Sequence, residues 1–258
     1  MLSLQLQNKK GLVLGVANER SIAWHIAQTL HQAGAQIALT YLDERALRKV
    51  QPLVDLVQAP IAMACDVTQE QHMIDLFERI TQEWGELDFI VHSLAYADIQ
   101  DLKNPIQDCS QAGFLQAMNV SAYSLLRLVH HAQALLNPSA SIVTMTYLGA
   151  EVAIAPYGIM GPVKAALESQ VKYLASSLGE QQIRVNAISA GPIKTLAASA
   201  IPKFRTLLKE TQQHTALRRG VTQQEVAQTV AFLVSDLSSG ITAEVLHVDA
   251  GAHAVYHV

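Results

Sequence analysis

Cysteine, charge and aromatic residues are all scarce in this sequence. Its 258 residues include two cysteines, Cys65 and Cys109, which excludes a disulfide scaffold and a cysteine-built zinc site. This usage favours a reducing setting, and we expect a cytoplasmic protein. Charged residues make up 16% of the chain and the net charge is -4, whereas 50% of the residues are apolar. These values exclude a disordered chain and argue against a dedicated nucleic-acid binder, which would carry a basic face.

Signals for secretion, membrane insertion and metal binding are missing as well. Residues 1–10 lack the basic-then-apolar layout of a signal peptide, and no apolar stretch reaches membrane-spanning length without a charge. The ten histidines are scattered, and His247, His253 and His257 near the end are too loosely spaced for a ligand motif. We therefore expect no membrane association and no metal site.

Short apolar segments alternate with longer helical stretches along the whole chain. The apolar segments, which we expect to be strands, span residues 11–17, 36–42, 60–67, 87–95, 141–148, 183–190 and 244–249. They are apolar almost throughout, as in a parallel sheet covered on both faces by helices. The clearest helical stretches span 21–32, 68–84, 113–136, 163–178 and 222–237. The pattern predicts a single domain over residues 1–258 with a Rossmann-like α/β fold, a doubly wound parallel seven-stranded sheet with helices on both faces.

Residues 189–215 form an irregular region that begins Ser-Ala-Gly-Pro and is rich in small residues. In an open α/β sheet the ligand lies beyond the carboxyl ends of the strands, so a long connection there can serve as a lid. An ordinary surface loop with a short helix explains the composition equally well.

Three positions suggest a dinucleotide site without establishing one. Gly15 follows the first strand and would let backbone N–H groups approach a pyrophosphate, but it stands alone rather than in a full G-x-G-x-x-G motif. Asp43, after the second strand, suits either a ribose 2′-hydroxyl or a helix N-cap, and either role disfavours NADP. Asp66, after the third strand, could accept from the adenine amino group or cap a helix.

Tyr147, Tyr157 and Lys164 provide a candidate catalytic group. An ammonium near a phenol lowers the phenol pKa and binds the nicotinamide ribose, while the phenol donates to an oxygen that gains negative charge during hydride transfer. Pro162 fits only the first turn of a helix, which predicts a helix start near residues 159–161, just after Tyr157. A chance grouping on a half-buried surface explains the spacing equally well.

Five segments together resemble the enoyl-acyl-carrier-protein reductases, a divergent branch of the short-chain dehydrogenase/reductase superfamily. They are residues 15–24, 92–97, 146–151, 184–193 and 235–242, and they occur in the family's order over essentially the whole chain. Tyr157 and Lys164 show a Tyr-x6-Lys spacing where ordinary superfamily members have Tyr-x3-Lys. Thr144 occupies the ordinary serine position. Tyr147, ten residues before Tyr157, is typical of the enoyl reductases.

The resemblance implies NADH-dependent reduction of a trans-2-enoyl-acyl-carrier-protein to the saturated acyl thioester in fatty acid elongation. It implies that hydride reaches the β-carbon, that Tyr157 hydrogen-bonds the resulting enolate, and that Lys164 holds the cofactor ribose while Tyr147 lines the pocket. The cofactor positions are Gly15, Ser21, Ile22, Asp66, Val67, Ser93, Leu94, Ala95, Lys164, Ile193 and Thr195. The substrate positions are Tyr147, Tyr157, Met160, Ala197, Ile201 and Phe204. The family also implies a substrate-binding loop over residues 195–215 and a homotetramer.

Several positions depart from the family pattern. His25 replaces a glycine near the pyrophosphate, Gly158 replaces an Asn after Tyr157, and Pro162 replaces a smaller residue. Ala243 and Ala250 replace glycines, and each would cost about 1 kcal/mol if its position needs φ > 0. These changes keep two alternatives open: a short-chain reductase acting on another enoyl or carbonyl substrate, and a diverged homologue that binds the cofactor with little turnover.

Overall fold

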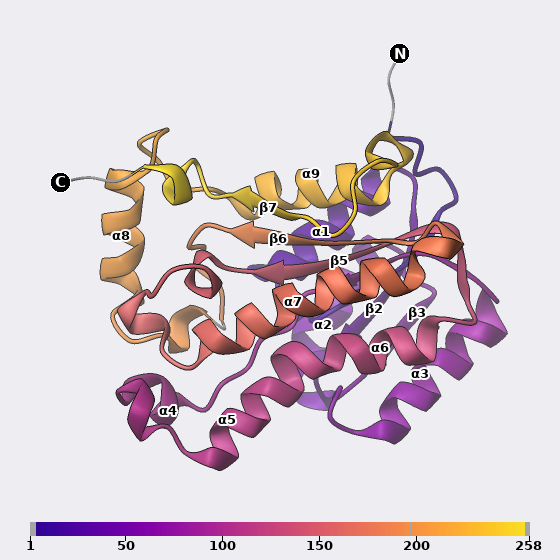
Figure 1. The fold of residues 1–258 in the computed structure, drawn as a ribbon. Helices are drawn as coiled ribbons and strands as arrows, with labels where there is room; N and C mark the ends of the chain where they lie inside the picture. The colour runs from indigo at the N-terminus through magenta and orange to yellow at the C-terminus, as the bar shows by residue number, and fades with distance from the viewer. Residues whose placement is uncertain (1–3, 197, 256–258) are drawn as a thin grey trace.

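The computed structural model describes residues 4–196 and 198–255. Its centre is a seven-stranded parallel sheet in the order β3-β2-β1-β4-β5-β6-β7 (Figure 1). The predicted doubly wound α/β architecture is confirmed. The strands are β1 (Lys10–Leu14), β2 (Gln36–Tyr41), β3 (Ile61–Ala64), β4 (Leu87–His92), β5 (Leu136–Thr146), β6 (Arg184–Ala190) and β7 (Val245–Val248).

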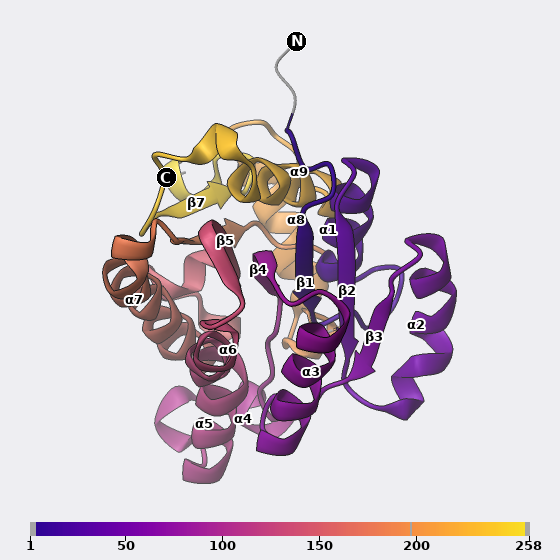
Figure 2. The same ribbon diagram turned by 90° about the vertical axis from the view of Figure 1, so that its right-hand side faces the viewer.

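Helices cover both faces of the sheet (Figure 2). The helices α1 (Ile22–Gln32), α2 (Glu44–Leu56) and α9 (Gln223–Val234) pack on one face. The other face carries α3 (Glu70–Glu83), α5 (Gln111–Met118), α6 (Ser124–Ala132) and α7 (Met160–Leu178). Two further helices, α4 (Ile99–Lys103) and α8 (Phe204–His214), lie toward the side to which the arrowheads of β5, β6 and β7 point in Figure 1.

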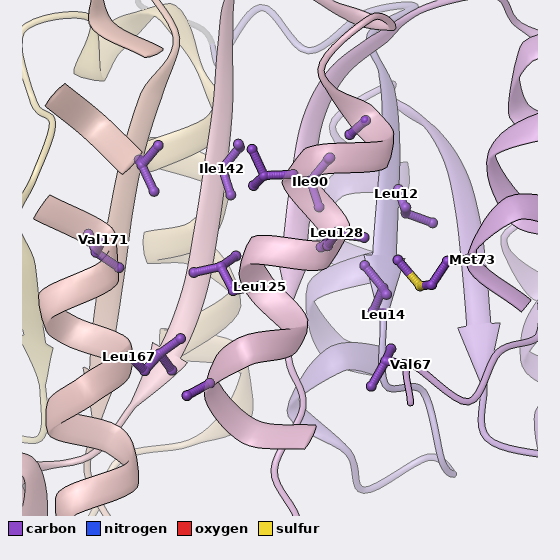
Figure 3. Close-up of a cluster of buried hydrophobic side chains, with 14 of the residues drawn as sticks. Leu12, Leu14, Val67, Met73, Ile90, Leu125, Leu128, Ile142, Leu167 and Val171 are labelled. Carbon is purple, nitrogen blue, oxygen red and sulfur yellow. The ribbon is translucent and has the colours of Figure 1, made fainter. Parts of the chain in front are cut away.

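The core on the α3–α7 face shows why the strands are apolar throughout. Ile90 of β4 and Ile142 of β5 are fully buried against Leu125 of α6 and Leu167 of α7 (Figure 3). Alternate residues of the same strands, such as Val91, are buried in the second cluster beneath α1 and α9. Burial on both sides removes the polar alternation that a one-sided sheet would show.

Among the described residues, none of the helices is both long and apolar enough to cross a membrane.

One helix prediction and the description of one irregular region need correction. The helical stretch 113–136 is wrong beyond Ala132, because Leu136 already belongs to β5 and is buried in the sheet. The region 189–215 is also more regular than its composition indicates: it contains α8 and a short 3-10 helix over Ala198–Ala200, and the alternative of a loop with a short helix allowed for a helix there. Phe204 is buried and Leu207, Leu208 and Thr211 are half-buried, so a single helical face holds α8 against the body.

The starts of α2 and α9 are capped by residue types that commonly cap helices. Asp43 is the N-cap of α2 and accepts a hydrogen bond from the Ala46 amide at 2.9 Å, which confirms the cap, one of its two predicted roles. Thr222 begins α9 in a capping box with Glu225. Asn119 opens a π-helical turn over Asn119–Tyr123 between α5 and α6.

Ala243 and Ala250 both adopt the left-handed conformation, with φ values of 64° and 58°. We predict that Ala243→Gly and Ala250→Gly each increase the free energy of unfolding by about 1 kcal/mol, because glycine has no Cβ to strain there. Urea unfolding of the single variants measures this. Ala165→Gly, on the exposed side of α7, is the control and lowers stability. Equal destabilisation in all three variants would contradict the prediction.

Candidate active site

A crevice for a dinucleotide is expected where the chain order reverses, between β1 and β4. Gly15 follows β1 there with φ at 93°. A Cβ built on Gly15 would lie 2.2 Å from the Ser93 carbonyl oxygen, so the loops after β1 and β4 approach as closely as a glycine permits. Such a cradle fits a group that must reach the backbone and the N-terminus of α1.

The other predicted cofactor residues lie along the same edge, because all seven strands are parallel. They follow β3 (Asp66, Val67), β4 (Ser93, Leu94, Ala95) and β6 (Ile193, Thr195) or begin α1 (Ser21, Ile22).

Several of their polar groups hold the loops in place. Asp66 Oδ1 accepts from the amide and hydroxyl of Thr68, and the Val67 carbonyl accepts from Arg127. Thr195 Oγ1 accepts from the Ala198 amide at 3.1 Å.

Tyr157 stands where the chain turns into α7. It ends a 3-10 turn, Gly158 follows with φ 52° and ψ −131°, and α7 begins at Met160, within the predicted range. Only glycine adopts this conformation readily, so the Gly158 that replaces the family's Asn fits the backbone at this turn. The turn leaves Tyr157 7% exposed beside the edge of the sheet.

Tyr147 and Tyr157 meet, as the family resemblance implies. Their rings make an edge-to-face contact with centroids 4.7 Å apart and an interplanar angle of 68°. Gly149 makes room for this pair, because a Cβ there would lie 2.4 Å from the Tyr157 ring.

The predicted acyl-chain residues lie in the same region, with one exception. Met160 and Ile201 pack in the cluster that contains Tyr157, and Phe204 is buried at the start of α8. Ala197 lies outside the described residues. A cavity of about 220 Å³ lies beside Tyr147, with Leu207 and Thr211 of α8 and Pro192 among its lining residues.

Lys164 is buried next to this pair, on the second turn of α7. Its Nζ donates to the carbonyls of Met145 at 2.8 Å and Leu94 at 3.3 Å, which ties α7 to the ends of β5 and β4. Burial lowers the pKa of Lys164 to about 8, and the negative charge of Glu168 opposes that effect. An ammonium has three protons, so within the described structure one remains for a ligand.

The expectation that the ammonium lowers the phenol pKa is wrong for this structure. Burial raises the pKa of Tyr157 far above its usual value, and Tyr147 and Glu168 add to the effect. Lys164 is not among the groups that act on this pKa, and its ammonium donates to two backbone carbonyls. Burial, with a contribution from Asp249, also raises the pKa of Tyr147, to about 12. Both phenols are therefore neutral donors at physiological pH.

Thr144, at the superfamily's serine position, is turned into the sheet. It is fully buried, and its Oγ1 lies 2.8 Å from Nδ1 of His92, whose Nε2 lies 2.8 Å from Ser124 Oγ. Burial and the nearby Lys164 lower the pKa of His92 to about 3. Thr144 thus supports β4 and β5 and leaves the pocket wall to Tyr147.

We predict that His92 makes stability fall in acid. The native His92 stays neutral below pH 6.5, while the unfolded residue takes up a proton. The free energy of unfolding therefore falls by about 1.4 kcal/mol per pH unit as the pH falls from 6.5 toward 3. His92→Gln keeps a donor and an acceptor but has no such proton uptake. Urea unfolding across this window should show a shallower pH dependence in the variant. An unchanged slope would assign the acid sensitivity to other groups.

Some neighbours of the site escape prediction from the sequence. Glu168 and Thr146 lie beside Lys164, and Gly149 lies beneath Tyr157. The spacing of four residues between Lys164 and Glu168 could have placed both on one helix face. Thr146 and Gly149 lie in the segment 146–151 that resembles the family, but nothing in the sequence gives either of them a role at the site.

His25 leaves the first helix in place. The imidazole is half-buried, burial lowers its pKa, and a hydrogen bond with the Glu19 backbone works in the opposite direction. The helix α1 still begins at Ile22.

In the described part of the chain, no group of three or more His, Cys, Asp or Glu residues is arranged to hold a metal ion.

Comparisons with known proteins agree with this geometry. Residues 15–253 match the family model described as Enoyl-(Acyl carrier protein) reductase. The NADH enoyl-acyl-carrier-protein reductase of Bacillus cereus is 46% identical over 250 residues, which are 96% of this chain and 98% of the relative. The NADPH reductase of Staphylococcus aureus MRSA252 is 45% identical over 254 residues, 98% of this chain and 99% of the relative.

Solved structures give the same result. The Aquifex aeolicus enoyl-acyl-carrier-protein reductase (NADH) has a TM-score of 0.95 at 40% identity and covers 98% of this chain and 99% of its own. The Bacillus cereus reductase with NADP+ and indole naphthyridinone also has a TM-score of 0.95, at 45% identity, covering 99% of this chain and 100% of its own. The chain therefore belongs to the enoyl-acyl-carrier-protein reductase family.

Proposed function

We propose that this protein uses NADH to reduce the trans-2 double bond of an enoyl-acyl-carrier-protein, giving the saturated acyl thioester in fatty acid elongation. The observation that supports this best is the contact between the Tyr147 and Tyr157 rings beside the buried Lys164. The relatives named above carry the activity in their names, and the site offers what such a reaction needs: a neutral phenol donor, a cation and an apolar wall.

The residues fit the cofactor in three places. The loop at Gly15 and the N-terminus of α1 suit a pyrophosphate, Asp66 suits the adenine, and the remaining ammonium proton of Lys164 suits the nicotinamide ribose. NADH, when bound, supplies the hydride that adds to the β-carbon of the thioester.

Tyr157 stabilises the reacting thioester through a hydrogen bond. Its phenol donates to the thioester oxygen as that oxygen gains negative charge, and it does so as a neutral group because burial raises its pKa. Tyr147 lines the pocket beside it. Met160, Ile201 and Phe204 contact the acyl chain and exclude water from the enolate.

NADH is preferred over NADPH in this proposal because of the end of β2. Asp43 places a carboxylate there, and a 2′-phosphate would meet that negative charge. The exposed Leu42 next to it offers no polar contact to a phosphate. Among the relatives, the Bacillus cereus protein is named for NADH and the Staphylococcus aureus protein for NADPH, so the preference varies within the family.

The experiment that tests the proposal follows oxidation of the reduced nicotinamide by absorbance with two thioesters of equal chain length. We expect rapid oxidation of NADH with a trans-2-enoyl-acyl-carrier-protein, slow oxidation with the 3-ketoacyl form, and a higher KM for NADPH. Preference for the keto substrate would favour a carbonyl reductase instead. Binding of NADH, shown by calorimetry, without any turnover would favour a diverged homologue.

The same proposal includes the organisation of the protein. Residues 1–258 act as a single domain, residues 195–215 with α8 order over the substrate as a lid, and the protein forms a homotetramer in the cytoplasm. The exposed Leu115, Tyr123 and Tyr173 on the α5–α6 and α7 helices support pairing of these helices between subunits. A monomeric mass in light scattering would contradict the tetramer.

A further inference from the structure

Glu168 is a half-buried carboxylate close to the candidate active site. It lies on α7, four residues after Lys164, so both side chains share one face of the helix. Its Oε1 accepts a hydrogen bond of 2.6 Å from Thr146 Oγ1. Thr146 ends β5, next to Met145, whose carbonyl accepts from Lys164 Nζ at 2.8 Å. One strand end therefore holds both the ammonium and the carboxylate.

The electrostatics make this pairing consequential. Burial lowers the pKa of Lys164 to about 8, close to the pH at which an enzyme works, and Glu168 is the group that raises it. Burial raises the pKa of Glu168 as well, while the Thr146 hydrogen bond lowers it and so favours the carboxylate form. Thr146 and Glu168 act in the same direction, toward a charged Lys164.

Other charged groups face the pair from several elements. His92 of β4 lies near Lys164 but stays neutral, because its pKa is about 3. Glu151, His247 of β7 and Lys172 of α7 act on Glu168. Glu151 is itself paired with His247 at 2.8 Å. Tyr157 faces Glu168 and is neutral. Glu168 is thus the carboxylate that acts on Lys164 among the described residues.

We propose that Glu168 is a positioning residue of this site: its carboxylate, oriented by Thr146, keeps Lys164 an ammonium that can bind the cofactor ribose. This inference rests on the proposed function for its kinetic readout. The binding of NADH gives a second readout that does not require turnover.

The test compares three single variants with the wild type over about pH 6 to 9.5, measuring kcat/KM and the Kd for NADH. Glu168→Gln removes the charge and keeps an oxygen for Thr146. We expect its alkaline loss of kcat/KM and of NADH affinity to begin about one pH unit lower than in the wild type. Thr146→Val keeps the charge and should shift the loss by less. Glu151→Gln removes a carboxylate that faces Glu168 rather than Lys164, and its profile should match the wild type.

The outcomes distinguish a failure of the proposed function from a failure of the inference about Glu168. A wild type that binds NADH but reduces no enoyl thioester would contradict the proposed function, and the shift in NADH affinity would still test Glu168. Equal losses at every pH in Glu168→Gln, with no shift, would show a merely structural role and overturn the inference. So would an equal shift in Glu151→Gln, which would indicate a general charge effect. If Glu168→Gln does not fold, Glu168→Ser replaces it with the same expectation.

Discussion

Tyr157→Phe should lower kcat for enoyl reduction by about 100- to 1,000-fold, the usual cost of losing one hydrogen bond to a developing oxyanion. The phenol is buried and neutral, and the Tyr147 ring lies against the Tyr157 ring. NADH affinity should stay near the wild-type value, because Lys164 keeps its bonds to Met145 and Leu94. Steady-state kinetics and calorimetry measure the two effects separately.

Two further tyrosine variants make this result specific. Tyr147→Phe removes the neighbouring hydroxyl and should cost much less in kcat, because Tyr147 lines the pocket in this account. Tyr173→Phe removes a hydroxyl from the exposed side of α7 and should have no effect. A larger loss in Tyr147→Phe than in Tyr157→Phe would exchange the roles of the two phenols.

Gly15→Ala should cost the protein both stability and its cofactor. The new Cβ would lie 2.2 Å from the Ser93 carbonyl oxygen at a φ of 93°, so both backbone strain and a clash arise. Overpacking and the left-handed conformation together amount to about 3 kcal/mol, which lowers Tm by roughly 6–12 °C. NADH binding should fall below detection, because the loop after β1 must move away from the loop after β4. Thermal unfolding and calorimetry measure these effects.

Gly85→Ala is a matched control for the strain alone. Gly85 also has a positive φ, 69°, but a Cβ there would meet its nearest atom at 3.8 Å. We expect a loss of about 1–2 kcal/mol and unchanged NADH binding. Similar effects in both variants would show that the approach of Gly15 to Ser93 is unimportant.

The strands could be predicted because burial on both faces makes them apolar without interruption. Val91 and Ile90 are adjacent in β4 and are buried on opposite sides of the sheet. The start of α7 could be predicted because Pro162 restricts the backbone locally. In contrast, the end of α6 could not, because Leu135 and Leu136 continue an apolar pattern that only the tertiary structure divides between a turn and β5.

The candidate catalytic residues could be named from the family pattern, but their electrostatics could not. The pKa of Tyr157 depends on burial by Gly149 and Tyr147, and the orientation of Lys164 depends on carbonyls of β5 and of the loop after β4. These contacts join residues far apart in the sequence. The strain at Ala243 and Ala250 is the opposite case, because a replaced glycine is visible in the sequence and the structure places both residues at positive φ.

The central claim is that hydride adds to the β-carbon of an enoyl thioester whose oxygen is held by Tyr157. Its most direct test is mass spectrometry of the product formed from a trans-2-enoyl-acyl-carrier-protein and NADH that carries deuterium at the transferred position. We expect a saturated acyl chain with one deuterium at the β-carbon and a solvent-derived hydrogen at the α-carbon, formed by the wild type and barely by Tyr157→Phe. Deuterium at a carbinol carbon, or a saturated product formed equally fast by Tyr157→Phe, would contradict it.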